Sequence, residues 1–186
     1  MSPAASRPMA GEEADGAPGG ERGCAAFRRQ DALLRDAERF VFREARLADA
    51  HDYDAWEALW TDDAIYWVPG EDADADPRGR MSIIYDNRSR IATRIKQLKT
   101  GKRFAQTPAS RLRRLITNVE LLGRDGGDLL VGASCMVGES RERGTTLWIG
   151  DVQWRLRETP DGLRMAAKKV VLIDHDQELP TLGFLL

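Results

Sequence analysis

The second half of the sequence, from Arg111 to Leu186, contains four long segments in which apolar and polar residues alternate, separated only by short turn sequences. Alternation with a period of two is typical of strands that bury one face. The turn sequences Asp125-Gly126-Gly127, Arg141–Gly144 and Pro160-Asp161-Gly162 supply residues that tolerate tight turns. The pattern therefore predicts an antiparallel meander. Strands of this length twist and curl, so the sheet acquires a concave face that other elements must fill.

The alternation also predicts which residues share a face of each strand. In the first segment they are Leu115, Thr117, Val119 and Leu121. In the second they are Leu129, Val131, Ala133, Cys135 and Val137. In the third they are Trp148, Val152, Trp154 and Leu156, and the fourth segment runs from Leu163 to about Asp174.

The first half of the sequence has the residues needed to fill the concave face. Apolar residues at helical spacing predict a helix over residues 31–50, and Asp52 is placed to cap a short helix that extends to Trp60. Short strands are expected at Ile65–Val68 and Ser82–Tyr85, followed by a helix over residues 87–100 that ends at Gly101. These elements predict an α+β fold in which N-terminal helices pack on a curled, mainly antiparallel sheet.

Length and composition define the expected domain organisation. A chain of 186 residues can build one domain with a substantial core. Residues 1–24 contain almost no large apolar side chains and cannot offset the entropy cost of ordering, so they are expected to form a flexible tail before a single domain of residues 25–186.

The expected location of the protein is the cytoplasm. The sequence has no apolar run long enough to span a membrane, and its first residues lack the apolar centre of a secretory signal. Its two cysteines, Cys24 and Cys135, do not form the pattern of a disulfide framework and suit a reducing compartment.

Charge is distributed unevenly along the chain. Residues 1–76 contain 18 acidic and 8 basic residues, whereas residues 77–186 contain 12 acidic and 20 basic residues. Ten lysines and arginines lie between Arg88 and Arg114 with no acid among them. Phe104 is the one aromatic residue in this cluster, and no nucleic-acid-binding motif is present, so a protein partner or self-association is favoured over nucleic acid.

Several motifs in one order resemble the small (β) subunits of aromatic-ring-hydroxylating dioxygenases. The resemblance covers about residues 31–186 and implies the cone-shaped fold that this family shares with nuclear transport factor 2 (NTF2-like). The segments that carry it are Phe40–Asp49, Tyr53–Trp56, Trp60–Pro69, Ser82–Asp86, Arg111–Val119 and Lys168–Asp174, followed by a Leu-Pro pair and the apolar Phe184–Leu186.

The resemblance implies a non-catalytic subunit that supports assembly. In such an enzyme a large (α) subunit carries a Rieske [2Fe–2S] cluster and a mononuclear Fe(II). Using O₂ and electrons from NADH, delivered through ferredoxin and reductase components, it dihydroxylates an aromatic substrate. The implied arrangement is an α3β3 hexamer containing a β trimer. Rieske centres need two cysteines and two histidines in paired spacing, and the two histidines here, His51 and His175, lie far from Cys24 and Cys135. No catalytic, cofactor-binding or metal-binding residue is therefore expected in this chain.

Five residues are candidates for contacts between subunits. Arginines form two-pronged pairs with carboxylates and are enriched at interfaces, as are aromatic residues. An ordinary role in the core or on a solvated strand face is the alternative for each of them. The apolar Phe184–Leu186 is expected to lie under the sheet or in a neighbouring subunit. The five candidates are Trp67, Tyr85, Arg111, Arg113 and Arg114.

Two other functions are compatible with the same fold. A stand-alone dehydratase or isomerase would use acid–base side chains that project into the cone, and the candidates are His51, Tyr66, Tyr85 and Asp86. The inward faces of the strands are predicted to be filled by large apolar residues, which argues against an open cavity. The third alternative is a small-molecule-binding module without enzymatic activity.

Overall fold

The computed structural model describes residues 19–70, 73, 76–79, 81–101, 108–142 and 144–186. The chain divides into two compact units, Met1–Leu33 and Leu34–Leu186. Of the first unit the structure describes the beginning of helix α1 (Gly19–Asp49), and the strands of the sheet belong to the second unit. Residues 1–18 and Phe104 lie outside the described residues. The division into a flexible tail of residues 1–24 and one domain of residues 25–186 stays a prediction.

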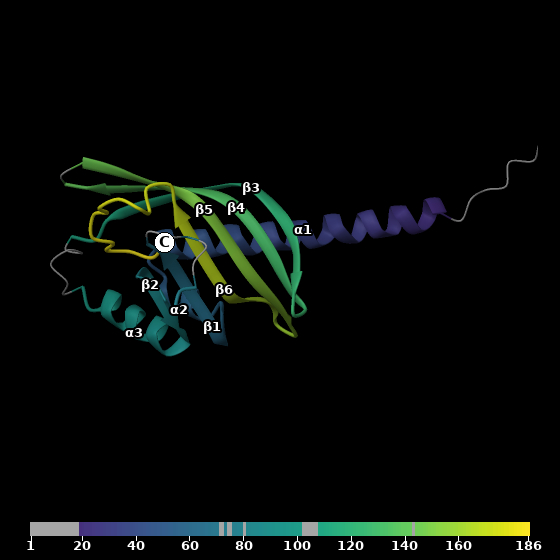
Figure 1. Cartoon of the computed structure of the whole chain (residues 1–186), viewed down its shortest axis with the longest axis horizontal. Helices are drawn as coiled ribbons and strands as arrows, with labels where there is room; N and C mark the ends of the chain where they lie inside the picture. The colour runs from purple at the N-terminus through teal and green to yellow at the C-terminus, as the bar shows by residue number, and fades with distance from the viewer. Residues whose placement is uncertain (1–18, 71–72, 74–75, 80, 102–107, 143) are drawn as a thin grey trace, which may run out of the picture. The chain divides into compact units, whose positions relative to one another are not determined.

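The second unit is built on a six-stranded mixed sheet with the strand order β2-β1-β6-β5-β4-β3 (Figure 1). Strands β3 to β6 form the predicted antiparallel meander, β2 pairs with β1 antiparallel, and β1 pairs with β6 parallel. The expected fold class is thereby confirmed. The strands are β1 (Trp60–Pro69), β2 (Ser82–Asn87), β3 (Arg111–Asp125), β4 (Asp128–Arg141), β5 (Gly144–Thr159) and β6 (Gly162–Leu172).

The predicted inward faces of β4 and β5 are confirmed, whereas the prediction for β3 is wrong at its beginning. Leu115 is 56% exposed and Thr117 is also exposed, although Val119 and Leu121 pack against the core as expected. The cause is a bulge: Asn118 has a φ of 54°, and the register with β4 shifts between Thr117 and Glu120. An inserted residue reverses the alternation, so the two ends of β3 bury opposite sets of positions.

Within the described ranges, three helices accompany the sheet. From Leu34 to Asp49, α1 buries one stripe, which consists of Ala37, Phe40, Val41, Glu44, Ala45 and Ala48. The helix begins at Gly19 instead of residue 31 because the preceding alanines, arginines and glutamate favour helix without an apolar stripe. Helix α2 (Tyr53–Glu57) has the predicted cap, since Asp52 accepts a hydrogen bond from Ala55 N at 3.2 Å.

Helix α2 ends before Trp60 because the chain already joins the sheet there: Met165 N donates to the Leu59 carbonyl at 2.7 Å. Helix α3 (Arg88–Lys99) is capped by Asn87 and buries Ile91 and Ile95. Gly101, with a φ of 59°, follows its end as predicted. Its left-handed backbone is the conformation that favours glycine after a helix.

The core lies on the concave face of the sheet. Its largest side chains include Trp56, Trp60 and Tyr66, whose rings meet at centroid distances of 5.2–6.1 Å. The segment Phe184–Leu186 is buried in the same core, with 1–4% of each residue exposed. The last residues of the sequence therefore occupy space that an empty cone would leave for a ligand.

Candidate functional site

Polar groups inside the cone hold the backbone of Leu186. The Tyr66 hydroxyl donates to the Leu186 main-chain oxygen at 3.0 Å and accepts from Leu186 N at 2.9 Å. Lys168 Nζ donates to the same oxygen at 2.7 Å. Burial raises the pKa of Tyr66, so its phenol remains protonated and acts as a fixed hydrogen-bonding group.

A buried ion pair lies directly beside this contact. Lys168 Nζ is 2.8 Å from Glu44 Oε1, and the two side chains are 3% and 1% exposed. Trp56 Nε1 donates to the same glutamate oxygen at 2.6 Å. Desolvation of two charges is costly, and here it is offset by the hydrogen bonds of Lys168 Nζ and Glu44 Oε1. Glu44 and Lys168 are thereby engaged with each other, with Trp56 and with Leu186, and they do not form a free acid–base pair.

The ion pair was missed by sequence reasoning, although each member left a signal. Glu44 interrupts the apolar stripe of α1, and Lys168 stands at an inward position of β6 between the buried Ala166 and Val170. A charged residue on a buried face needs a partner. The alternation pattern does not say that these two charges meet, because 124 residues separate them.

Two of the four acid–base candidates, Tyr66 on β1 and Asp86 on β2, lie opposite each other in the sheet and are buried. Tyr66 lies in the core, whereas Tyr85 lies on the outer face of the sheet against Trp67, with ring centroids 6.5 Å apart. Asp86 pairs with Arg94 at 2.7 Å, and His51 lies at the corner between α1 and α2. Tyr66 is bonded to Leu186 and Asp86 to Arg94, while Tyr85 and His51 lie apart from them, so the four residues do not form one acid–base site.

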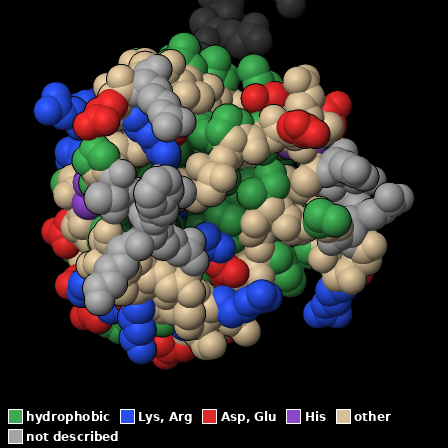
Figure 2. Space-filling view, turned by 90° about the vertical axis from the view of Figure 1, so that its left-hand side faces the viewer, with side chains coloured by type: hydrophobic (Ala, Val, Ile, Leu, Met, Phe, Trp, Pro, Cys, Tyr) green, Lys and Arg blue, Asp and Glu red, His purple; other side chains and the backbone are tan. Residues whose placement is uncertain are grey.

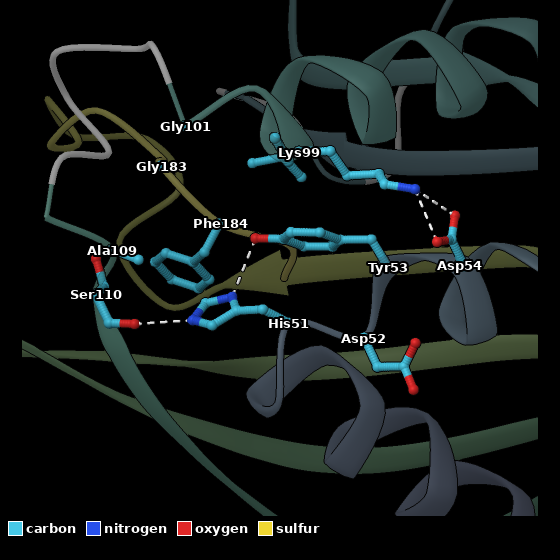
Figure 3. Close-up of a pocket in the computed structure, with 11 residues that line it drawn as sticks. His51, Asp52, Tyr53, Asp54, Lys99, Gly101, Ala109, Ser110, Gly183 and Phe184 are labelled. Atoms are coloured by element: carbon cyan, nitrogen blue, oxygen red, sulfur yellow. Dashed lines mark hydrogen bonds and ion pairs between the residues drawn. The ribbon is translucent and has the colours of Figure 1, made fainter.

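His51 forms part of a surface pocket of about 390 Å³ (Figure 3). Its Nε2 lies 2.9 Å from the Ser110 carbonyl oxygen, and its Nδ1 lies 3.0 Å from the Tyr53 hydroxyl. Since a carbonyl oxygen only accepts, Nε2 of the neutral ring carries the proton and Nδ1 accepts from Tyr53. Burial raises the pKa of Tyr53, which keeps its hydroxyl in the donor form.

The remaining polar groups of this pocket are paired. Lys99 Nζ contacts both carboxylate oxygens of Asp54 at 2.6 and 2.7 Å. Ser110, whose carbonyl holds His51, donates its hydroxyl to the buried Glu139 at 2.6 Å. The contacts connect the corner after α1 to the start of β3. His51 therefore has a structural role, because it joins the end of α1 to the start of β3.

The described residues contain no group of three or more histidines, cysteines, aspartates or glutamates that could hold a metal ion. His175 Nδ1 contacts the Gly70 carbonyl at 2.7 Å, far in sequence from either cysteine. Burial raises the pKa of the Cys135 thiol, which disfavours the thiolate that binds metals. None of the helices within the described ranges is long and apolar enough to cross a membrane.

The interface candidates occupy two edges of the sheet. Trp67 and Tyr85 are partly exposed on the outer face of β1 and β2, where Lys169 Nζ lies 4.5 Å from the Trp67 ring centroid. Arg111 and Arg113 are exposed on β3. The side chain of Arg114 is 2% exposed and donates to Asp49 and to the Leu185 carbonyl, so it supports the core segment.

Comparisons with known proteins agree with this architecture. The 2-halobenzoate 1,2-dioxygenase small subunit of Burkholderia cepacia is 32% identical over 142 residues, which cover 74% of this chain and 86% of the relative. The crystal structure of the β subunit of benzoate 1,2-dioxygenase from Burkholderia mallei has a TM-score of 0.64 at 29% identity, covering 75% and 89% of the two chains.

The fold is also similar to that of an NTF2-like protein from Novosphingobium aromaticivorans. The TM-score is 0.54 at 20% identity, and the match covers 85% of this chain and 93% of the other. The family model described as "Ring hydroxylating beta subunit" matches residues 43–177. This range contains all six strands and the buried Glu44–Lys168 pair. The chain therefore belongs to the family of β subunits of ring-hydroxylating dioxygenases.

Proposed function

We propose that this chain is the non-catalytic small subunit of a multicomponent aromatic-ring-hydroxylating dioxygenase. The observation that carries the proposal is the filled cone: Phe184–Leu186 and the Glu44–Lys168 pair occupy the space that a catalytic or binding cavity would need. Membership of the β-subunit family supports the same conclusion. The role of the chain is then to hold catalytic subunits together through its surface.

The proposed partner is a large (α) subunit that carries the Rieske [2Fe–2S] cluster and the mononuclear Fe(II). Three copies of each subunit form the proposed α3β3 hexamer in the cytoplasm, and ferredoxin and reductase components deliver electrons from NADH. The names of two relatives, a 2-halobenzoate and a benzoate dioxygenase, make benzoate-type acids the first substrates to test.

Four of the five interface candidates are suitable for contacts between subunits. Trp67 and Tyr85 present a partly exposed aromatic pair, and Arg111 and Arg113 present exposed guanidinium groups. Arg114 instead supports such a surface from within, through its pairing with Asp49. Aromatic residues and arginines are the residue types that most often dominate binding energy at interfaces.

Co-expression with the cognate α subunit tests the proposal. We expect a mixed complex that oxygenates a benzoate-type acid with NADH consumption when the electron-transfer components are added. The chain alone is expected to show neither bound iron nor turnover. Size-exclusion chromatography, iron analysis and product detection measure these outcomes.

Two results would count against this function. One is turnover by the isolated chain that is lost in His51→Ala, which would favour the stand-alone enzyme. The other is a folded chain that never co-purifies with the α subunit.

A further inference from the structure

The outer face of the sheet carries an exposed apolar patch at the β3 edge. Leu115 on β3 lies opposite Met136 on β4, and Arg113 lies opposite Gly138, which in turn lies opposite Leu147 on β5. Leu115 and Leu147 are each 56% exposed, and Met136 is 36% exposed. Arg111 and Arg113 border these side chains. We call this set of residues, Arg111, Arg113, Leu115, Met136 and Leu147, the arginine patch.

A second apolar feature lies beside the opposite edge of the sheet. It is a groove of about 480 Å³ between the start of β2 and the segment after β6. Met81 and Ile83, which are 88% and 38% exposed, form one wall. Leu179 and Leu182 line the other side, and the exposed Asp176 and Glu178 supply its charges. These six residues are called the acidic groove.

The side of the molecule that carries the segment after β6 faces the viewer in Figure 2. Hydrophobic side chains gather in a hollow at the centre of this side, with acidic and basic side chains around it. Large apolar side chains that lie exposed next to one another often mark a surface that binds a partner.

The two surfaces carry opposite charges that do not form ion pairs within the described part of this chain. Within the described part of the chain, neither Arg111 nor Arg113 forms an ion pair, and neither does Asp176 nor Glu178. The arginine patch contains no acid, and the acidic groove contains no lysine or arginine. Complementary potentials of this kind steer association and fix its register.

The shapes of the two surfaces are also complementary. The arginine patch lies on the outer face of a curled sheet and projects Leu115 and Leu147, whereas the acidic groove is hollow. Contact between two identical arginine patches would bring guanidinium groups together. A contact between different patches is heterologous, and its repetition forms a ring when the rotation closes.

We propose that the arginine patch of one copy of this chain docks into the acidic groove of the next copy, head to tail, and that this contact closes the ring of β subunits. The inference rests on the proposed function, and it specifies which surfaces form the β trimer. Opposite edges of one sheet, β3 and β2, thereby contribute the two halves of each contact.

Charge reversal of the full-length chain tests the contact. We expect Arg111→Glu/Arg113→Glu to weaken self-association on the order of ten-fold or more, because it places four carboxylates together. Asp176→Lys/Glu178→Lys should weaken it similarly. The variant with all four substitutions restores opposite charges and should again form rings of the wild-type size. Sedimentation velocity over a range of protein concentrations at low salt measures each association constant.

Matched variants make the result specific. Arg39→Glu/Arg43→Glu changes the net charge by the same amount on the exposed side of α1 and should leave association unchanged. Circular dichroism verifies that each variant is folded. If a reversal pair fails to fold, Arg113→Glu and Glu178→Lys are measured singly and together, with the same restoration expected.

Three outcomes overturn the inference. They are reversal variants that associate like the wild type, a four-residue variant that does not recover, and a stable dimer in place of a ring. Co-expression with the α subunit separates the two proposals. If reversal leaves self-association intact but abolishes α binding, the surfaces serve the α subunit, and the head-to-tail contact is wrong while the proposed function stands. If the wild type never binds an α subunit, the proposed function itself fails.

Discussion

At the scale of single residues, the core is organised around a buried charge pair and a tyrosine. Glu44, Lys168 and Tyr66 come from α1, β6 and β1, and all three are buried. Lys168 and Tyr66 both bind the main-chain oxygen of Leu186. Tyr66 and Lys168 thereby fix the segment Phe184–Leu186 inside the cone.

Removal of the lysine should be strongly destabilising. Lys168→Met leaves the Glu44 carboxylate buried without a cation, and we expect a loss of about 3–5 kcal/mol in the free energy of unfolding. Urea denaturation measures the loss. Lys169→Met, a neighbouring change on the outer face beside Trp67, should cost about 1 kcal/mol or less. Equal losses in the two variants would contradict the role assigned to the buried pair.

Tyr66 should make stability depend on alkaline pH. Its folded-state pKa is raised above the unfolded value of about 10, so its contribution is complete below pH ~10 and is lost as the pH rises further. Tyr66→Phe should cost about 1–3 kcal/mol at neutral pH, because the buried Leu186 N loses its acceptor. The variant should also show a shallower fall in stability above pH ~10. Tyr85→Phe is the control, and an unchanged alkaline slope in Tyr66→Phe would disprove the assignment.

At the scale of elements, the alternation of side chains predicted the meander and the inward faces of β4 and β5. It failed at Leu115 and Thr117 because a single residue, Asn118, adopts a left-handed backbone and reverses the phase of β3. Asparagine tolerates that conformation, but many asparagines adopt ordinary strand angles. The presence of asparagine at position 118 is therefore compatible with a bulge but does not predict one.

The candidate site was harder to predict than the strands. Arg111, Arg113 and Arg114 look alike in sequence, and the structure separates them because alternate strand positions face solvent and core. His51 was predicted as an acid–base candidate, but its hydrogen bond with Tyr53, only two positions later, was not predicted. Burial of Phe184–Leu186 was expected, but its polar anchors come from distant strands that no local pattern connects.

The bulge gives a direct test of the register of β3. Asn118→Val places a β-branched side chain at a φ of 54° and should destabilise the chain by about 1–3 kcal/mol. Asn118→Gly accepts this backbone and should remain near the wild-type stability. Thermal and urea unfolding compare the two variants. Similar stability for valine and glycine would show that the strand relaxes to a regular register.

The segment after β6 should contribute to stability as a core element. Leu185 is 1% exposed, so Leu185→Ala should lower the free energy of unfolding by about 2–5 kcal/mol. Ile173→Ala removes a similar side chain that is 71% exposed and should change stability by no more than about 0.5 kcal/mol. A small effect at Leu185 would mean that the core remains closed without its side chain.

At the scale of the whole molecule, the small net charge of −2 conceals an acidic first part and a basic second part. We expect the association of the isolated chain to weaken with salt, because the screening length falls from about 10 Å at 0.1 M to about 3 Å at 1 M. Apolar contacts should retain part of the affinity. Sedimentation in low and high salt measures the effect, and an association that is indifferent to salt would assign it to apolar contacts alone.

The parallel pairing of β1 with β6 also governs how the chain folds. Tyr66 and Leu186 bond to each other across 120 residues, so their contact closes a long loop. Topologies with such distant contacts fold slowly, in milliseconds to seconds. At synthesis rates of about 5–20 residues per second, roughly ten seconds separate the synthesis of β1 from that of Leu186. During that interval the side chains of Trp60 and Tyr66 are not yet buried, and the nascent chain exposes apolar surface to which chaperones bind.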